Sequence, residues 1–376
     1  MVTSKPILVS AVTPPKHCVH LIALAHGIDG SVDDLTNLRI EIGKGSAGVQ
    51  TFMTTSCHGR THDGIKCCAD LYWAELRPFL ENICKDCASS SPLRVSFVGH
   101  SLGGLILRAV AAKLLDCELQ SCCTLDTMIC IATPHLGCRL LGNGGQGGVA
   151  PLMSAFGPSI MRAGLRMIKG KTGPDLLLDN NTLLELASGK ALRSFRRRVA
   201  YCNGQGDWLV NLESASLFTA EEAAVALRPS IDGCQKDGNV LWRPAAHEAT
   251  PAVTPAWPST FGVVDGVMRL QPLPDTWDPS PTVKLHTTWD DRSGRGRAAA
   301  ETLRCIRSAG DWEAHVCHFL PDKASFAGGV FSPHIDLVDH PHCTQRYGRE
   351  VVRHIGQCFA DEPATNMNDK DHLERL

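Results

Sequence analysis

Residues 95–106 read VSFVGHSLGGLI, a short apolar run that breaks at a glycine and then continues in an apolar helical pattern. Within it, Gly99-His100-Ser101-Leu102-Gly103 fits the G-x-S-x-G pattern of a nucleophile elbow, a sharp strand-to-helix turn with a serine at its tip. Glycines are needed on both sides because such a turn crowds its neighbours until only hydrogen side chains fit. The pattern predicts Ser101 as a nucleophile, with the backbone N–H of Leu102 directed at a developing oxyanion.

The composition indicates a single, nearly neutral domain. The chain has 376 residues, of which 43% are hydrophobic, and a formal net charge of −2. A chain of this length can bury one large core, so we expect one domain over residues 1–376. The balanced charge gives no electrostatic basis for binding nucleic acid, and we expect no such partner.

The sequence also predicts where the protein resides. No apolar run reaches the roughly 18 to 20 residues of a transmembrane helix, and the first 25 residues lack the regions of a secretion signal. The 17 cysteines are scattered, which suits reduced thiols better than a disulfide framework. Cys84 and Cys87 form a C-x-x-C pair, but no second pair at zinc-ribbon spacing accompanies it, so we expect ordinary thiols at a helix end. We therefore expect a cytoplasmic protein without a transmembrane segment.

Strands and helices are predicted to alternate on both sides of the elbow. Strand-like runs cover residues 20–25, 49–54, 95–98, 124–132, 199–202 and 314–320. Helical patterns follow most of them, including 102–115, 183–195 and 347–359. This alternation predicts an α/β fold with a mostly parallel central sheet and helices on both faces.

Two segments interrupt the alternation. Residues 149–168 carry apolar and methionine side chains with interleaved basic residues, within a predicted helical cap or lid over 139–190. The pattern fits either a core helix or a mobile lid that meets acyl chains, and the second interpretation predicts peripheral contact with membranes or lipid droplets. Residues 216–310 contain nine prolines, and we predict a proline-rich insertion that lacks regular elements and is partly disordered.

A serine nucleophile needs a base within hydrogen-bond reach and an acid that orients the base. In α/β hydrolases these follow in the chain order Ser, acid, His. Asp207 lies in a turn directly after the predicted strand 199–202, where that order places the acid. Asp175 and Asp179 are its rivals, but they are better suited to cap a helix or face water.

Residue types alone do not select the base. After the insertion the chain offers six candidates, namely His315, His318, His334, His340, His342 and His354. The first two fall in a predicted strand and the last in the final helix. The loop between them, with His334, His340 and His342, supplies the exposure that a base at a strand's carboxyl end requires.

Several motifs occur in a characteristic order along the chain: His26-Gly27-Ile28, Thr61-His62-Asp63-Gly64-Ile65, the elbow extended by Gly104, Ala132-Thr133-Pro134-His135-Leu136-Gly137, Tyr201-Cys202-Asn203 with Asp207, and Tyr347-Gly348 with His354. Together they resemble the putative serine esterase family of lipase-like α/β hydrolases. The resemblance covers residues 17–215 and 311–359 and implies the α/β-hydrolase fold.

The resemblance also implies roles for individual residues. In that family the catalytic histidine lies thirteen residues before the Tyr-Gly pair, which here selects His334. Pro333 stands where a small residue is usual and residues 324–330 are additional, so His340 stays a competitor. The family further implies that Ile28 supplies the second oxyanion N–H beside Leu102.

These observations predict a serine carboxylic ester hydrolase, a lipase or esterase. It would cleave acyl esters, of lipids by the resemblance, through an acyl-enzyme on Ser101, with His334 as base and Asp207 as the orienting acid. This chemistry requires no metal or organic cofactor. The alternative is a non-catalytic protein of the same fold that binds a lipid or protein partner through residues 216–310, against which the intact Ser, Asp and His set argues.

Overall fold

A computed structural model of the chain describes residues 19–44, 48–86, 92–138, 170–204, 207, 209–226, 240–241, 261–264, 267–286, 294–318, 332–341 and 348–360. All structural statements below refer to these residues. Of the predicted cap or lid over 139–190, residues 139–169 lie outside them.

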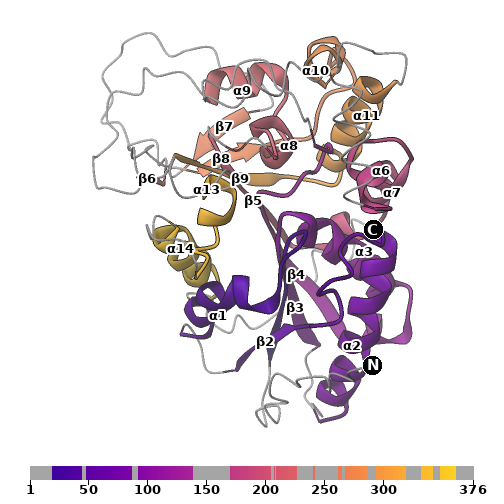
Figure 1. The fold of residues 1–376 in the computed structure, drawn as a ribbon, viewed down its shortest axis with the longest axis vertical. Helices are drawn as coiled ribbons and strands as arrows, with labels where there is room; N and C mark the ends of the chain where they lie inside the picture. Colours follow the sequence, from indigo (N-terminus) through magenta and orange to yellow (C-terminus); the bar gives the residue numbers. More distant parts are fainter. Residues whose placement is uncertain are drawn as a thin grey trace.

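A sheet of nine described strands forms the centre of the molecule (Figure 1). Its spatial order is β2-β1-β3-β4-β5-β9-β8-β7, with β6 also paired to β9. The strands are β1 (His20–Ala25), β2 (Val49–Met53), β3 (Leu93–His100), β4 (Cys123–Ile131), β5 (Arg197–Asn203), β6 (Val240–Leu241), β7 (Phe261–Val264), β8 (Val267–Leu270) and β9 (Trp312–His318). The six strands from β2 to β9 run parallel, and β6, β7 and β8 add antiparallel pairs at one edge. The predicted α/β class with a mostly parallel sheet is confirmed.

Helices cover both faces of the sheet, which explains why β1, β3, β4 and β5 are buried along nearly their whole length. On one face lie α2 (Ile65–Asp86), α3 (Leu102–Leu115) and α7 (Thr182–Ser188). On the other lie α1 (Thr36–Gly43), which follows the short helix η1 (Val32–Leu35), and α14 (Arg349–Ala360). Each face has its own hydrophobic core, so the sheet is a rigid platform between two packed layers.

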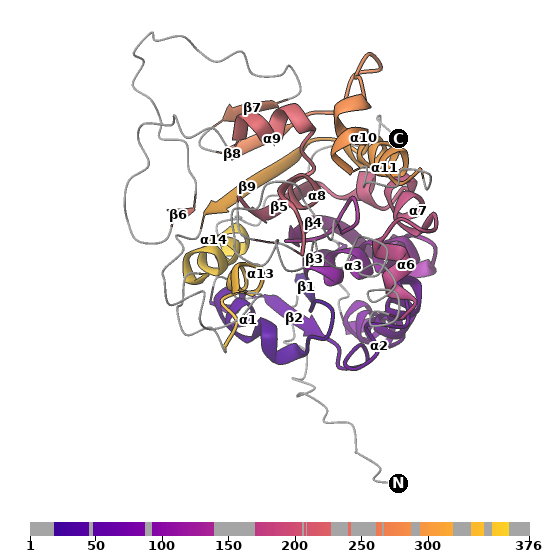
Figure 2. The same ribbon diagram turned by 45° about the horizontal axis from the view of Figure 1, so that its top comes forward.

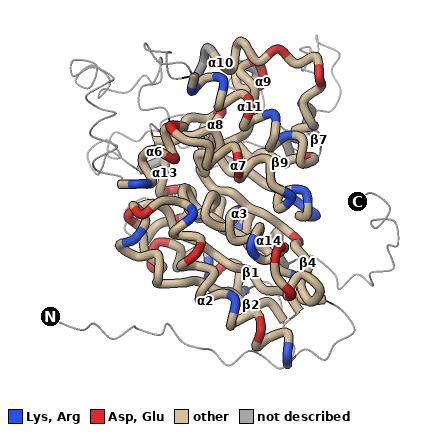
Figure 3. Tube along the Cα trace, turned by 90° about the vertical axis from the view of Figure 1, so that its right-hand side faces the viewer, with Lys and Arg blue, Asp and Glu red and all other residues tan. Residues whose placement is uncertain are grey.

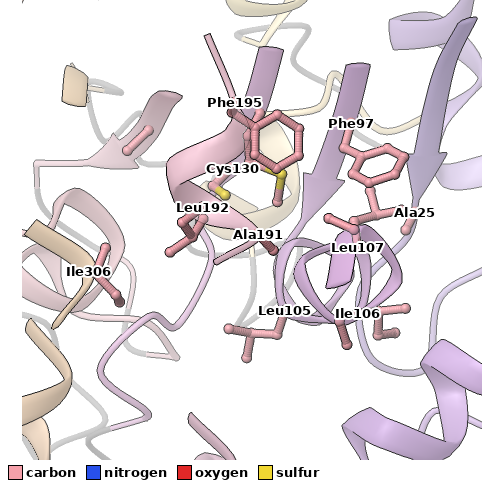
Figure 4. Close-up of a cluster of buried hydrophobic side chains, with 14 of the residues drawn as sticks. Ala25, Phe97, Leu105, Ile106, Leu107, Cys130, Ala191, Leu192, Phe195 and Ile306 are labelled. Atoms are coloured by element: carbon pink, nitrogen blue, oxygen red, sulfur yellow. The ribbon is translucent and has the colours of Figure 1, made fainter. Parts of the chain in front are cut away.

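The larger core includes buried side chains of α3, the helix that follows the elbow (Figure 4). Leu105, Ile106 and Leu107 of α3 are each at most 1% exposed. Phe97 of β3 meets Phe195 edge to face, with ring centroids 5.8 Å apart. The helix that begins at the nucleophile position is therefore fixed by packing along its length.

The prediction that residues 216–310 lack regular elements is wrong for the described parts of that segment. They form α9 (Ala220–Ala226), the β7–β8 hairpin, α10 (Ser280–His286) and α11 (Arg295–Arg307) (Figure 2). The hairpin extends the sheet beyond β9. The prolines explain the difference, because the last of the nine is Pro281, which lies in the first turn of α10, where a proline is tolerated. Residues 282–310 are free of proline, and α11 buries an alanine- and leucine-containing face there.

The predicted helix 183–195 is also interrupted. It is divided into α7 and η3 (Leu192–Ser194), with extended backbone at Gly189 between them. Three further short helices are present. In the sequence, α6 (Thr172–Leu176) precedes β5, α8 (Leu212–Ser216) follows it, and η2 (Glu118–Ser121) precedes β4.

Charged residues of both signs are spread over the helices and loops (Figure 3). Among the described helices, none combines the length and the apolar character needed to cross a membrane.

Candidate active site

Ser101 occupies the turn between β3 and α3, with φ 53° and ψ −124°. A positive φ is strained for a residue with a side chain, and such strain persists only where the surroundings impose it. Here the Ser101 N–H donates to the Ile131 carbonyl at 2.7 Å. A Cβ at Gly99 would collide with the backbone of Gly104, and one at Gly103 with the Ala25 carbonyl. The local geometry is that of a nucleophile elbow.

The loop after β1 passes directly beside the serine. A Cβ on Gly27 would lie 3.0 Å from the Ser101 Cβ and 3.5 Å from its Oγ, so only glycine allows this approach without a shift. Asp29, two residues on, has φ 57° and donates its N–H to Thr61 Oγ1 at 3.0 Å. The backbone around Ile28 is thereby held close to the hydroxyl.

Asp207 and His334 form a buried pair at the carboxyl ends of the strands, where Ser101 also lies. The Nδ1 of His334 lies 2.8 Å from Asp207 Oδ2, although the residues are 127 positions apart in the chain. Asp207 follows β5, as predicted, whereas His334 lies on the short helix α13 (Ser332–Asp336) rather than in the predicted loop. Ser101 and His334 are each 6% exposed, so the site is largely shielded from water.

The Asp207 carboxylate is held by donors on every side. The N–H groups of Leu209 and Val210 reach Oδ1 at 3.1 and 3.0 Å, and the Asn203 amide reaches Oδ2 at 2.9 Å. Burial alone would raise the pKa of this carboxyl, but the charge and hydrogen bond of His334, with the Val210 and Asn203 donors, outweigh burial and lower it. Asp207 is therefore an ionised acceptor, which places the proton of the His334 ring on Nδ1.

His100 is a site residue that sequence reasoning missed. Its Nε2 donates to the His334 carbonyl at 3.0 Å, and the two rings lie 4.9 Å apart between centroids. Burial, and next the charge of His334, lower the pKa of His100 to about 3, so its ring stays neutral at ordinary pH. Because His100 precedes Ser101, this bond ties the His334 backbone to the elbow. The variable position of the motif gave no sign of this role.

The competing residues have other partners. His340 Nε2 lies 3.2 Å from Asp34 Oδ1, His315 stacks on Tyr201, and His354 Nδ1 lies 2.8 Å from the Tyr201 hydroxyl. Asp175 accepts the Ile65 N–H at the start of α2 at 2.9 Å, and Asp179 pairs with Arg295. His342 and the side chain of His318 are outside the described residues.

A second Ser, His and Asp group lies toward the amino ends of the strands. His20 Nε2 lies 2.7 Å from Ser96 Oγ, and Ser96 Oγ lies 3.5 Å from Asp126 Oδ2. Two arginines also reach that carboxylate, Arg94 at 3.0 Å and Arg196 at 2.8 Å. Ser96 is completely buried inside β3, so this group is a structural network.

A parallel sheet whose central strand ends in a serine elbow defines the class of the protein, an α/β hydrolase. Residues 15–219 match the family described as "Putative serine esterase (DUF676)". Since the match covers more than half of the chain, the protein belongs to this family.

The chain is also similar to a curated protein and to several solved structures. The chain is 30% identical over 226 residues to a Saccharomyces cerevisiae protein named "Putative lipase ROG1"; the match covers 55% of this chain and 30% of the yeast protein. Among solved structures, a type II thioesterase of the yersiniabactin pathway aligns with 16% identity and a TM-score of 0.28, covering 53% of this chain and 78% of that one. A lipase-esterase related protein from Clostridium acetobutylicum gives 11% identity and a TM-score of 0.25, with 54% and 81% covered.

Proposed function

We propose that the protein is a serine carboxylic ester hydrolase that cleaves acyl esters of lipids through an acyl-enzyme on Ser101. The observation that carries the proposal is the 2.8 Å pair of His334 and Asp207, tied to the strained serine elbow by His100. Family membership supports the reaction class, and the three side chains give it a chemical route.

The ring orientation of His334 supports its role as the base. With the proton on Nδ1 directed at the Asp207 carboxylate, Nε2 keeps its lone pair and accepts the Ser101 proton. Ser101 Oγ then attacks the acyl carbon, and Asp207 stabilises the imidazolium that forms. His334 returns the proton to the leaving alcohol, and the acyl group stays on Ser101 until water, activated by the same imidazole, releases it.

Two backbone N–H groups serve the oxyanion in this scheme. Leu102 is the first residue of α3, and the first N–H groups of a helix have no intrahelical acceptor. Ile28 follows Gly27, whose backbone lies against the Ser101 side chain. Donors fixed in this way stabilise charge without reorganising during the reaction.

The lipid character of the substrate is supported by the name of the yeast relative, "Putative lipase ROG1". It is tested by hydrolysis of nitrophenyl esters of increasing acyl length, above and below the concentration at which each forms micelles. We expect faster turnover of long esters and a rise in rate at the micellar transition. Equal or better turnover of short soluble esters, with no such rise, would contradict the lipid assignment and leave the ester-hydrolase assignment in place.

The Ser101→Ala variant is the matched control for every ester. Its background rate defines what the nucleophile contributes. If the native chain hydrolyses no ester above that background, the chain is a non-catalytic binding protein of this fold.

A further inference from the structure

A group of thiols lies at the amino ends of the strands, opposite the elbow. Cys84 is in the last turn of α2, and Cys123 is the first residue of β4. Their sulfur atoms are 3.8 Å apart. Cys122, next in the chain, is exposed and also contacts Cys84. The proposed hydrolase reaction uses none of these residues.

We propose that Cys84 and Cys123 form a reversible disulfide, an oxidative modification site that joins α2 to β4. The sequence pairs Cys84 with Cys87 as a C-x-x-C motif, for which we expect ordinary thiols. The fold instead brings Cys84 to Cys123, 39 positions away. A disulfide requires the sulfurs to close from 3.8 Å to about 2 Å, and Cys84 lies at a partly exposed helix end.

The two thiols differ in reactivity. Cys84 is partly exposed, and the hydrogen bond from Cys123 lowers its pKa to about 7. Cys123 is 8% exposed, and its contact with Cys84 together with burial raises its pKa. Cys84 is therefore the thiolate that reacts first, and Cys123 is the resolving thiol.

A hydroperoxide supplies the two oxidising equivalents. The Cys84 thiolate attacks one peroxide oxygen, the O–O bond breaks, and hydroxide or alkoxide leaves with the electron pair, giving a sulfenic acid on Cys84. The Cys123 sulfur then attacks the Cys84 sulfur and displaces the hydroxyl group, which leaves as water with the thiol proton. A thiol reductant reverses the bond by exchange, for which Cys84 offers the more open sulfur.

A zinc site is the competing explanation, because the edge of a tetrahedral zinc thiolate site is also about 3.8 Å. Zinc needs three or four protein ligands. Within the described ranges, no three His, Cys, Asp or Glu side chains are grouped so that they could hold a metal. Because the described thiols of Cys84, Cys122 and Cys123 do not form such a group, their contacts favour the disulfide.

The bond would close a loop that contains β3, the elbow and α3. Cross-linking removes conformational freedom from the unfolded chain, so the oxidised protein should be the more stable form. Ser101 lies at the other end of β3, and we expect ester hydrolysis to change less than about twofold on oxidation.

The test treats the full chain with a small excess of hydrogen peroxide, blocks free thiols, and maps linked peptides by mass spectrometry without reduction. We expect a mass loss of two hydrogens, a Cys84–Cys123 link placed by fragmentation, and a rise of about 5 °C or more in melting temperature that dithiothreitol reverses. Cys84→Ser and Cys123→Ser should lose all three, whereas Cys117→Ser and Cys122→Ser should keep them.

Several results would overturn the site. They are a dominant link from Cys84 to Cys87 or Cys122, no link in the native chain, or one equivalent of zinc released when the thiols of the purified protein are modified. The linked peptide is sought in the unsubstituted protein, so the outcome does not depend on how a variant folds.

Discussion

The two Ser, His and Asp groups of this protein contain the same residue types at opposite ends of the same sheet. At the carboxyl end, His334 bonds to Asp207 beside Ser101. At the amino end, His20 contacts Ser96, which lies against Asp126. The comparison separates the features expected of the proposed nucleophile from those of a structural serine.

The first difference is in the charge around the carboxylate. Asp126 is neutralised by Arg196 and Arg94, which overcome the effect of burial and lower its pKa to about 2. Burial, and next the charge of Arg94, lower the pKa of His20 to about 4. Asp207, by contrast, accepts from neutral donors and His334, so its charge is available to stabilise an imidazolium.

The second difference is in the backbone. Ser96 lies within β3, and its Oγ accepts the Thr127 N–H at 3.1 Å, where the pairing of β3 and β4 shifts register. Ser101 lies at a positive φ after the strand has ended, next to a loop that only glycine allows so near. Of these two serines, only Ser101 combines an available acid and base with backbone donors.

The largest contrast is expected from removing each hydroxyl. Ser101→Ala should lower kcat/KM for a nitrophenyl ester by at least about 10⁴-fold while leaving the melting temperature near that of the native chain. Ser96→Ala should keep kcat/KM within about threefold but lower the free energy of unfolding by about 1–3 kcal/mol, because it leaves buried partners unpaired. Kinetics and denaturant unfolding of both variants measure this, and comparable activity losses would remove the distinction.

Replacing the two carboxylates should also give different effects, on catalysis for Asp207 and on stability for Asp126. Asp207→Asn should reduce kcat by about 10³- to 10⁴-fold, because an amide no longer fixes the His334 proton on Nδ1. Asp126→Asn should spare kcat and cost about 1–2 kcal/mol of stability, since the two arginines that lose their counter-charge are partly exposed. If Asp207→Asn were active and merely unstable, Asp207 would belong with the structural group.

Gly27 tests the loop beside the serine. Gly27→Ala should lower kcat by about 10²-fold, because the new Cβ forces the backbone at Ile28 away from Ser101. Gly43→Ala is the matched control, since a Cβ there meets nothing within 4 Å. Stopped assays of both variants decide the matter, and equal activities would exclude the loop from the reaction.

The last contrast is in acid stability. The pKa of His20 is about 4 in the folded chain and 6.5 ordinarily, so the unfolded chain binds this proton first as pH falls. The stability due to this difference is present above pH 6.5 and is lost down to pH 4, up to about 3 kcal/mol. His20→Gln should therefore lose less stability than the native chain between those pH values in denaturant titrations, and parallel curves would contradict the network.

Features set by local sequence were predictable. β1 and α3 begin and end at the predicted residues, and the Ser101 turn follows from the glycines on either side. The position of Asp207 at this end of the sheet follows from the turn directly after β5. These inferences need only the order of neighbours along the chain.

Features set by tertiary contact were not predictable in this way. The His100 bond joins residues 234 positions apart, and Arg197 of β5 pairs with Glu313 of the neighbouring strand β9. The break at Gly189 also divides a stretch that the apolar pattern predicts as one helix. For His334, residues alone left several histidines open, and the family resemblance was needed to choose among them.

The most direct test of the account is covalent labelling of the native chain with a fluorophosphonate probe, followed by peptide mapping of the adduct. The account predicts one phosphonylated residue, Ser101, with labelling lost in His334→Ala and retained in His340→Ala. An adduct on another serine, or labelling that survives in Ser101→Ala, would contradict it.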